Sequence, residues 1–240
     1  MRFIIKKNSE EIGEAIAEEI ATLIKNKPNC VLGLATGSSP IPTYKQLIKK
    51  YENKEISFKE VTSFNLDEYI NYPYEYVSYK YFMDDELFNH VDMRNEAKHF
   101  PSQENLEEYD SEIEKAGGVD IQVLGIGVDG HIGFNEPGCP FDSKTHVMKL
   151  DESTRLANQR FFKCLEDVPT HAVTMGIGTI LKSKKNVLIA SDLSKIDAVA
   201  SLLKGIPTIE WPATALINHP DTDIYLTEDL YEAAKKKAGK

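Results

Sequence analysis

Short apolar runs alternate along this chain with longer segments whose apolar residues recur at helical spacing. The runs are nearly continuous in apolar residues, as at 186–190, and do not alternate between apolar and polar positions. Such runs are typical of strands that are buried on both faces of a parallel sheet and connected by helices. The alternation therefore predicts an α/β fold, a three-layer Rossmann-like and mostly parallel sheet with helices on both faces.

The boundaries of the predicted elements follow from turn residues and helix caps. Strands are expected at 1–6, 30–35, 61–64, 119–126, 171–175, 186–190 and 223–226. Helices are expected between them, including 9–26, 106–115, 151–165 and 195–205, whereas 140–150 is expected to be irregular. With 240 residues, no internal repeat and no linker, the chain is predicted to form one domain spanning 1–240.

Charge and hydropathy exclude two classes of partner. The chain has 28 basic and 38 acidic residues, a net charge of −10, so it should repel a nucleic-acid backbone. The one dense basic run, 235–237, is expected at a solvated helix end. No apolar segment is long enough to cross a membrane and the first residues do not form an export signal, which favours a cytoplasmic protein without a membrane partner.

The three cysteines, Cys30, Cys139 and Cys164, lie far apart in the sequence. An odd and widely spaced set argues against a disulfide framework and against a zinc site made of cysteines. Reduced thiols are therefore expected.

The stretch 124–137, which reads LGIGVDGHIGFNEP, is the first candidate for chemistry. It begins as the end of an apolar run and then sets three ionisable side chains among glycines: Asp129, His131 and Glu136. Glycine lets the backbone turn sharply and approach a ligand, and open α/β sheets bind ligands at the carboxyl ends of their strands. An Asp-Gly turn and an ordinary histidine are the alternative interpretation, but the three groups together favour chemistry.

A second candidate site follows the predicted strand 30–35, which runs into TGSSP at 36–40 and then into a helical pattern. Unpaired amides and the positive end of the helix dipole point at one spot in such a turn, which suits a phosphate. The turn is not a Walker loop and lacks the glycines of a dinucleotide fingerprint. A helix cap made by Ser38 or Ser39 is the alternative.

A third candidate follows the predicted strand 61–64, where the chain reads NLDEY at 65–69. Acidic pairs after strands are common in surface turns, and that is the alternative here. Asp67 nevertheless repeats the arrangement of a strand followed by a carboxylate that is seen at 124–137. It is therefore a candidate catalytic residue.

The sequence resembles the glucosamine-6-phosphate deaminase family in several motifs: GLATGSSP at 33–40, SFNLDEY at 63–69, LGIGVDGHIGFNEP at 124–137, RFF at 160–162 and AVTMGIGTIL at 172–181. The resemblance spans nearly the whole chain in the same order, and DGHIGFNEP is specific to it. Sugar-phosphate lactonases share the broader fold but resemble this loop less.

The resemblance implies conversion of glucosamine 6-phosphate and water to fructose 6-phosphate and ammonia, in amino-sugar catabolism. Asp67 would remove the C2 proton and return it to C1. His131 would move the proton during opening of the sugar ring, while Asp129 and Glu136 orient and charge the imidazole. An imidazole titrates near neutral pH and can both donate and accept, as this step needs. No organic cofactor and no metal is implied.

The resemblance also implies the phosphate ligands and a moving segment. The phosphate would be bound by Thr36, Gly37 and Ser38, with Arg160 and Lys195 as cationic partners. Alone, each cation would be interpreted as a solvated surface residue. Residues 150–170 would form a lid.

The sequence departs from the family pattern in two places. Longer members form allosteric hexamers whose effector ligands follow the catalytic loop, but here that stretch carries Cys139, His146 and Met148. The short, non-allosteric form is therefore expected, as a monomer or weak oligomer. Val128 stands where many relatives have a polar residue, which weakens the match without removing an essential group.

Three other functions are compatible with these residues. A sugar-phosphate lactonase needs only a base and water. A hydrolase could use Asp129, His131 and Glu136 as metal ligands, since their types suit it. A sugar-phosphate sensor could share the general fold, although the acidic charge and the full set of ionisable groups argue against it.

Overall fold

The chain is built around a seven-stranded parallel sheet in the order β1-β10-β9-β6-β2-β3-β5. The computed structural model describes residues 1–152, 154–156 and 158–240. The strands are β1 (Arg2–Lys6), β2 (Val31–Leu34), β3 (Thr62–Asn65), β5 (Lys98–His99), β6 (Ile121–Leu124), β9 (Asn186–Ala190) and β10 (Thr222–Thr227). The predicted Rossmann-like sheet is thus confirmed.

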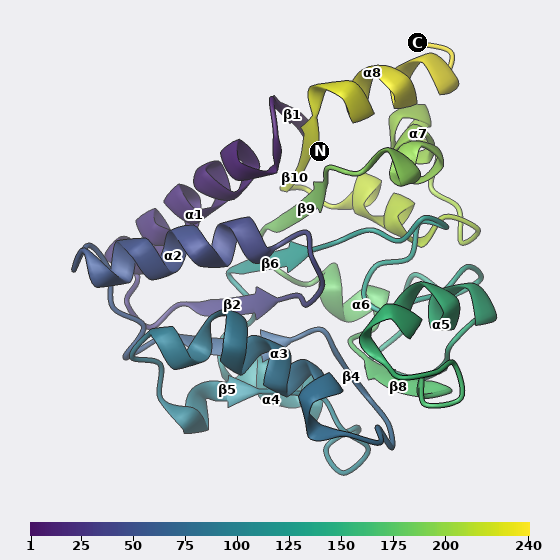
Figure 1. Cartoon of the computed structure of the whole chain (residues 1–240). Coiled ribbons are helices and arrows are strands. Elements are labelled where there is room, and N and C mark those ends of the chain that lie inside the picture. Colours follow the sequence, from purple (N-terminus) through teal and green to yellow (C-terminus); the bar gives the residue numbers. More distant parts are fainter.

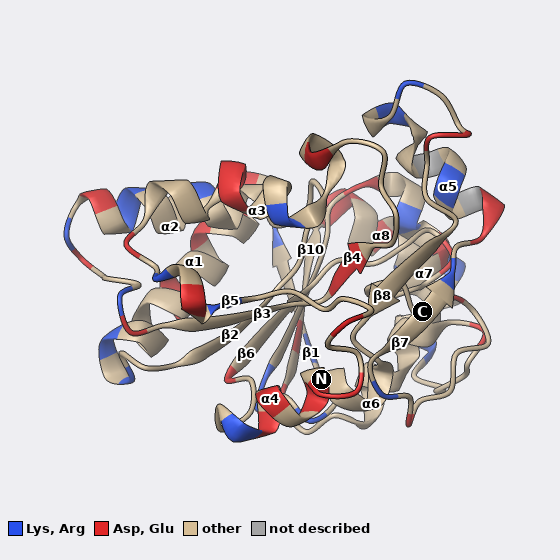
Figure 2. Ribbon diagram, turned by 90° about the horizontal axis from the view of Figure 1, so that it is seen from below, with Lys and Arg blue, Asp and Glu red and all other residues tan. Residues whose placement is uncertain are grey.

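Helices cover both faces of this sheet, with one apolar core on each side. The first core packs α1 (Ser9–Asn26), α2 (Ile41–Glu52) and α3 (Tyr79–Glu86) on the sheet. The second packs α4 (Tyr109–Lys115), α6 (Ile177–Ile180), α7 (Ile196–Lys204), η6 (Pro212–Asn218) and α8 (Glu228–Lys237). Figure 1 shows the arrangement, and Figure 2 shows α1 to α3 on one side with α4 and α6 on the other. Short 3-10 helices occupy connections: η1 (Glu75–Val77), η2 (Phe88–His90), η3 (Asn95–Ala97) and η5 (Leu193–Lys195).

Helix α1 shows how the sequence pattern produces these layers. Its predicted apolar face is buried on the sheet, with Ile12, Ile16 and Ile20 at most 1% exposed. A Cβ atom at Gly13 would lie 2.5 Å from the backbone carbon of Pro42, so only glycine allows this close approach of α2. The packing of α1 therefore sets the position at which α2 begins.

The strand order reverses between β2 and β6. From β2 the chain adds β3 and β5 on one side, whereas β6, β9 and β10 extend the sheet on the other side. Gly33 on β2 makes room for the Gln122 side chain on β6, because a Cβ there would lie 2.0 Å from Gln122 Oε1. A reversal of this kind opens a crevice at the carboxyl ends of the two strands, where ligands bind.

A second, antiparallel sheet corrects two predictions. It has the order β4-β8-β7, with β4 (Asp67–Tyr69), β8 (His171–Thr174) and β7 (His146–Lys149). The segment 140–150 is thus not wholly irregular; β7 escaped prediction because its residues alternate between half-buried and exposed positions. The strand predicted at 171–175 exists, but it pairs with β4 and β7 and does not join the parallel sheet.

The helix predicted at 151–165 is shorter than expected. Helix α5 covers Glu152–Asn158 and is followed by η4 (Gln159–Phe161). The Arg155 guanidinium donates hydrogen bonds to the carbonyls of Leu165 at 2.9 Å and of Val168 at 3.0 Å. Phe162 has extended backbone angles, so the helical path ends there, and the Arg155 bonds hold the following residues against α5.

The remaining structural expectations concern the cysteines and the membrane. Cys30 and Cys139 are buried and Cys164 is partly buried, and all three are free thiols, as predicted. None of the described helices combines the length and the apolar character needed to cross a bilayer.

Candidate functional site

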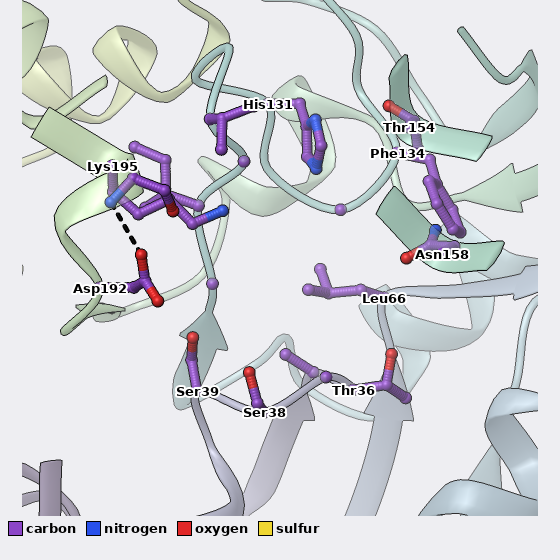
Figure 3. A pocket seen from close by; sticks show the side chains of 18 of the residues that line it. Thr36, Ser38, Ser39, Leu66, His131, Phe134, Thr154, Asn158, Asp192 and Lys195 are labelled. Carbon is purple, nitrogen blue, oxygen red and sulfur yellow. Dashed lines mark hydrogen bonds between the residues drawn. The ribbon is translucent and has the colours of Figure 1, made fainter. Parts of the chain in front are cut away.

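A cavity of about 480 Å³ lies at the reversal of strand order, beyond the carboxyl ends of β2, β3, β6 and β9. Segments far apart in the sequence line it, and Figure 3 shows their side chains around the cavity. The residues predicted for the site that line it are Thr36, Gly37, Ser38, Asp67, Asp129, His131, Arg160 and Lys195. Glu136 lies behind this wall and is 4% exposed.

The loop after β6 owes its shape to its glycines. The Gly127 amide donates to the His131 carbonyl at 2.9 Å, and a Cβ at Gly127 would lie 2.3 Å from the imidazole. Gly130 and Gly133 have φ angles of +82° and +59°, in the left-handed region that side chains disfavour. The glycines therefore fold this loop tightly and leave space for the His131 ring.

Two carboxylates approach the same nitrogen of the His131 imidazole. Its Nδ1 atom is 2.7 Å from Asp129 Oδ1 and 3.6 Å from Glu136 Oε2. Burial by itself lowers the pKa of His131, but the two carboxylates outweigh burial and raise the pKa to about 9. The neighbouring imidazole likewise outweighs the effect of burial on Asp129, whose pKa lies well below its ordinary value.

Asp67 faces the same loop from β4. A Cβ at Gly133 would lie 3.4 Å from Asp67 Oδ2, which places the carboxylate against the glycine two residues beyond His131. Asp67 is 6% exposed, and burial together with the charge of Glu68 raises its pKa to about 8, although His131 acts in the opposite direction. The structure thus brings Asp67 and the 124–137 loop together.

Glu68, next to Asp67, has a structural role. Its carboxylate accepts the backbone amides of Tyr69, Tyr79 and Lys80, each at 2.9 Å. Two of these amides belong to the first turn of α3, so Glu68 holds the start of this helix. Burial raises the pKa of Glu68, while these three bonds favour its charged form.

The turn after β2 presents an uncapped helix N-terminus to the cavity. Helix α2 has Pro40 at its N-cap position, and no side chain among the described residues caps its first turn, so Ser38 and Ser39 do not form the cap that was the alternative. Gly37 adopts a φ of +88°, which shapes the turn. Free amides at the positive end of a helix suit an anion.

Two cations also line the cavity. Lys195 occupies the N-cap position of α7; burial lowers its pKa, although Asp192 and Asp129 nearby favour its charged form. Arg160 in η4 is exposed, and its guanidinium lies 4.8 Å from the centre of the Phe161 ring. Both cations are thus placed where they can reach an anion in the cavity.

Several residues of the site were not predicted from the sequence. Thr154 and Asn158 reach the cavity from α5. Thr174 on β8 accepts the Phe134 amide at 3.0 Å, and the Asn135 side chain donates to the Met175 carbonyl at 2.9 Å. These residues fasten the 124–137 loop to the second sheet, a tertiary contact for which the sequence carries no local signal.

The geometry also suits a metal ion. One donor atom from each of Asp129, His131 and Glu136 can be chosen so that all three lie within 4.8 Å of one another. This spacing is compatible with the metal-dependent hydrolase, and chelation of the protein tests that alternative.

The similarity to known proteins extends over nearly the whole chain. Residues 6–226 match the family described as glucosamine-6-phosphate isomerases/6-phosphogluconolactonase. A glucosamine-6-phosphate deaminase of Thermoanaerobacter pseudethanolicus is 50% identical over 236 residues, which cover 95% of this chain and 93% of that protein. A glucosamine-6-phosphate deaminase of Malacoplasma penetrans is also 50% identical, over 94% of this chain and 97% of that protein.

Solved structures give the same result. A protein described as a monomeric glucosamine-6-phosphate deaminase superposes with a TM-score of 0.94 at 40% identity, covering 97% of this chain and all of that chain. The 6-phosphogluconolactonase of Thermotoga maritima superposes with a TM-score of 0.72 at 19% identity over 94% and 97% of the two chains, which shows a shared fold. The chain belongs to the family of glucosamine-6-phosphate isomerases and 6-phosphogluconolactonases, on the branch of the glucosamine-6-phosphate deaminases.

Proposed function

We propose that this protein is an enzyme that converts glucosamine 6-phosphate and water to fructose 6-phosphate and ammonia, in amino-sugar catabolism. The observation that carries the proposal is a single cavity that joins an uncapped helix N-terminus to the group of Asp67, Asp129 and His131. The activity of its relatives, 50% identical over nearly their whole length, supports the same reaction.

His131 catalyses the opening of the sugar ring. Both carboxylates approach Nδ1, so Nε2 is the nitrogen left for the sugar. A pKa of about 9 keeps the imidazole charged at neutral pH, so it can donate a proton to the ring oxygen. The neutral ring that remains accepts the proton of the anomeric hydroxyl, and Asp129 and Glu136 hold its orientation throughout.

Isomerisation falls to Asp67. An ordinary aspartate is a weak base, but burial has raised the pKa of Asp67 to about 8 and so increased the basicity of its carboxylate. Asp67 removes the C2 proton of the open-chain aldose and delivers it to C1. In the same isomerisation the amine nitrogen loses a proton and the aldehyde oxygen gains one, which leaves a hydroxyl at C1 and an imine at C2. Water adds to this imine and ammonia departs, giving the ketose, and this chain of steps requires neither a metal nor an organic cofactor.

The phosphate is bound at the turn of Thr36, Gly37 and Ser38. Lys195 adds a point charge, and Arg160 adds a planar fork that can give two parallel hydrogen bonds. Arg160 lies in the segment 150–170, which acts as a lid of the single domain 1–240. Closure of this lid would bring Arg160 onto the phosphate.

The test is an ammonia assay with glucosamine 6-phosphate and the folded protein. Release of ammonia together with fructose 6-phosphate supports the proposal. Hydrolysis of a sugar-phosphate lactone without ammonia release would instead assign the lactonase activity. Solvent deuterium should appear at C1 of the ketose, because the proton held on the Asp67 carboxyl can exchange with solvent before it is delivered to C1.

The protein is proposed to act as a non-allosteric monomer or weak oligomer. The structural relative with a TM-score of 0.94 is described as monomeric. His146 and Met148 lie on β7 and Cys139 is buried beside the loop, where longer relatives are expected to have effector ligands. Light scattering of the purified protein tests the assembly, and the cytoplasmic location stays a prediction.

A further inference from the structure

One hydroxyl of helix α5 reaches the acid–base group. Thr154 Oγ1 donates a 2.7 Å hydrogen bond to Glu136 Oε1, and the two residues are 6% and 4% exposed. The other carboxylate oxygen, Oε2, is buried without a hydrogen-bond partner among the described residues and lies 3.6 Å from His131 Nδ1. The Thr154 bond therefore holds the Glu136 carboxylate in the orientation that turns its second oxygen toward the imidazole.

The backbone of the loop does not fix this orientation. The Glu136 amide bonds the Phe134 carbonyl and the Glu136 carbonyl accepts the Cys139 amide, each at 3.0 Å, so the main chain is held at this residue. The carboxylate can still rotate about its side-chain bonds, and in the described part of the chain Thr154 is the one hydroxyl that donates to it. Without this hydroxyl, Glu136 would lose the contact that sets its rotamer.

Thr154 also lies close in sequence to a proposed phosphate ligand. It belongs to α5, which leads directly into η4 and Arg160. A phosphate bound by Arg160 would restrain this pair of helices and with them the Thr154 hydroxyl. The contact thus connects binding of the substrate phosphate to the orientation of Glu136, which would lie near the sugar ring.

We infer that Thr154 is a positioning residue for ring opening, whose hydroxyl turns Glu136 toward His131 from the segment that carries Arg160. This inference rests on the proposed roles of Glu136 and His131. Thr154 acts through Glu136, so its loss should reduce the rate of the chemical steps more than substrate binding.

The test compares Thr154→Val, which keeps the branched shape without the hydroxyl, with Thr154→Ser, which keeps the hydroxyl. We expect kcat to fall about tenfold in the valine variant with KM nearly unchanged, and to remain near the original value in the serine variant. The pKa of His131, followed by NMR titration of its imidazole, should fall in the valine variant only, because Glu136 helps to raise it.

A control and a reference variant separate the possible outcomes. Ser111→Ala removes a hydroxyl that donates to the Glu108 carbonyl at the start of α4, outside the cavity and the proposed lid, and it should change neither kcat nor the titration of His131. Glu136→Gln tests the underlying role: full activity in that variant would remove the proposed function of Glu136 itself.

Glu136→Gln can lose activity while Thr154→Val keeps both its kcat and its His131 titration. That result would overturn the inference about Thr154 and leave the proposed role of Glu136 standing. A valine variant that changes only the urea midpoint of unfolding would also overturn it, because the role would then be structural. If the valine variant does not fold, Thr154→Ala and Thr154→Ser provide the same comparison, since both side chains are smaller than the original.

Discussion

Replacing Asp67 with Asn should stabilise the folded protein while removing its turnover. The pKa of Asp67 rises from 3.8 to about 8 on folding, first because of burial and then because of the Glu68 charge. Between these values the folded state holds a proton that the unfolded state has lost, so stability falls as the pH rises from about 4 to 8. At pH 7 the deficit is about 4 kcal/mol, because each unit of pKa difference corresponds to about 1.4 kcal/mol.

Asparagine has nearly the same shape and no proton to lose, so Asp67→Asn avoids this deficit. We expect the variant to be more stable than the original protein by about 4 kcal/mol at pH 7 and by less than about 1 kcal/mol at pH 4. Turnover should fall at least about 100-fold, because the proposed base is absent, while substrate binding is largely retained.

Urea unfolding at several pH values, followed by the fluorescence of the single tryptophan, Trp211, measures the stability. Asp84→Asn is the control, because Asp84 pairs with Lys80 on the surface of α3 and its replacement should change stability by less than about 0.5 kcal/mol. A gain for Asp67→Asn that does not grow with pH, or a loss at pH 8, would refute the account of a buried and destabilising base. Loss of both binding and turnover would assign Asp67 a folding role.

Three further predictions test the proposed phosphate ligand Arg160, the metal-dependent alternative and the ion pairs of Asp120. Arg160→Ala should raise KM for glucosamine 6-phosphate about 10- to 100-fold with a smaller effect on kcat. The control Arg94→Ala should leave both KM and kcat unchanged. An unaltered KM in Arg160→Ala would dismiss Arg160 as a phosphate ligand. Exhaustive chelation should leave ammonia release intact, and a loss restored by a divalent metal would favour the metal-dependent alternative. Asp120→Asn should lower the free energy of unfolding by about 1–3 kcal/mol without changing kcat, because buried Asp120 pairs with Lys27 at 2.7 Å and Lys184 at 2.6 Å. Urea midpoints measure the stability of this variant, and the ammonia assay measures its kcat.

The sequence predicted the parts of the fold that depend on local pattern. Six of the seven strands of the parallel sheet were found because buried strands between helices are nearly continuous in apolar residues, as β9 is over its whole length. The seventh, β5, was missed because two half-buried residues, Lys98 and His99, form no apolar run. Strand β7 was missed because it has exposed positions, and β4 because its residues Asp67–Tyr69 resemble a surface turn. Pairing of these two strands with β8 depends on tertiary contacts and not on local propensity.

The sequence indicated candidate site residues on strand-following loops because these loops carry unusual groupings of glycine, carboxylate and imidazole. The structure places these loops around one cavity, and the roles of the residues stay predictions. The contact of Thr154 with Glu136 spans 18 positions and joins a helix to a loop, so no spacing rule points to it. Asn135, which ties the loop to the carbonyl of Met175, was inside the matched motif but had no role in the chemical argument.

The distribution of charge in the cavity predicts that the proposed substrate would bind in one direction. Its phosphate is an anion and suits the uncapped end of α2 together with Lys195 and Arg160, whereas its amine is a cation when protonated and suits the carboxylates around His131.

The positive charge of the protonated amine can also favour the ionised form of Asp67, the proposed base. In the cavity without substrate, burial and the Glu68 charge favour the protonated form of Asp67, and a nearby positive charge acts in the opposite direction, as His131 already does. An ammonium group brought in by the substrate would add to that effect and lower the pKa of Asp67, so the carboxylate would form where and when a proton is to be removed. A sugar phosphate with a hydroxyl at C2 brings no such charge and would leave Asp67 largely protonated. Under the proposed mechanism, selection for an amino sugar would thus follow from the cost of burying the Asp67 carboxylate, and not from the α/β fold that this chain shares with lactonases.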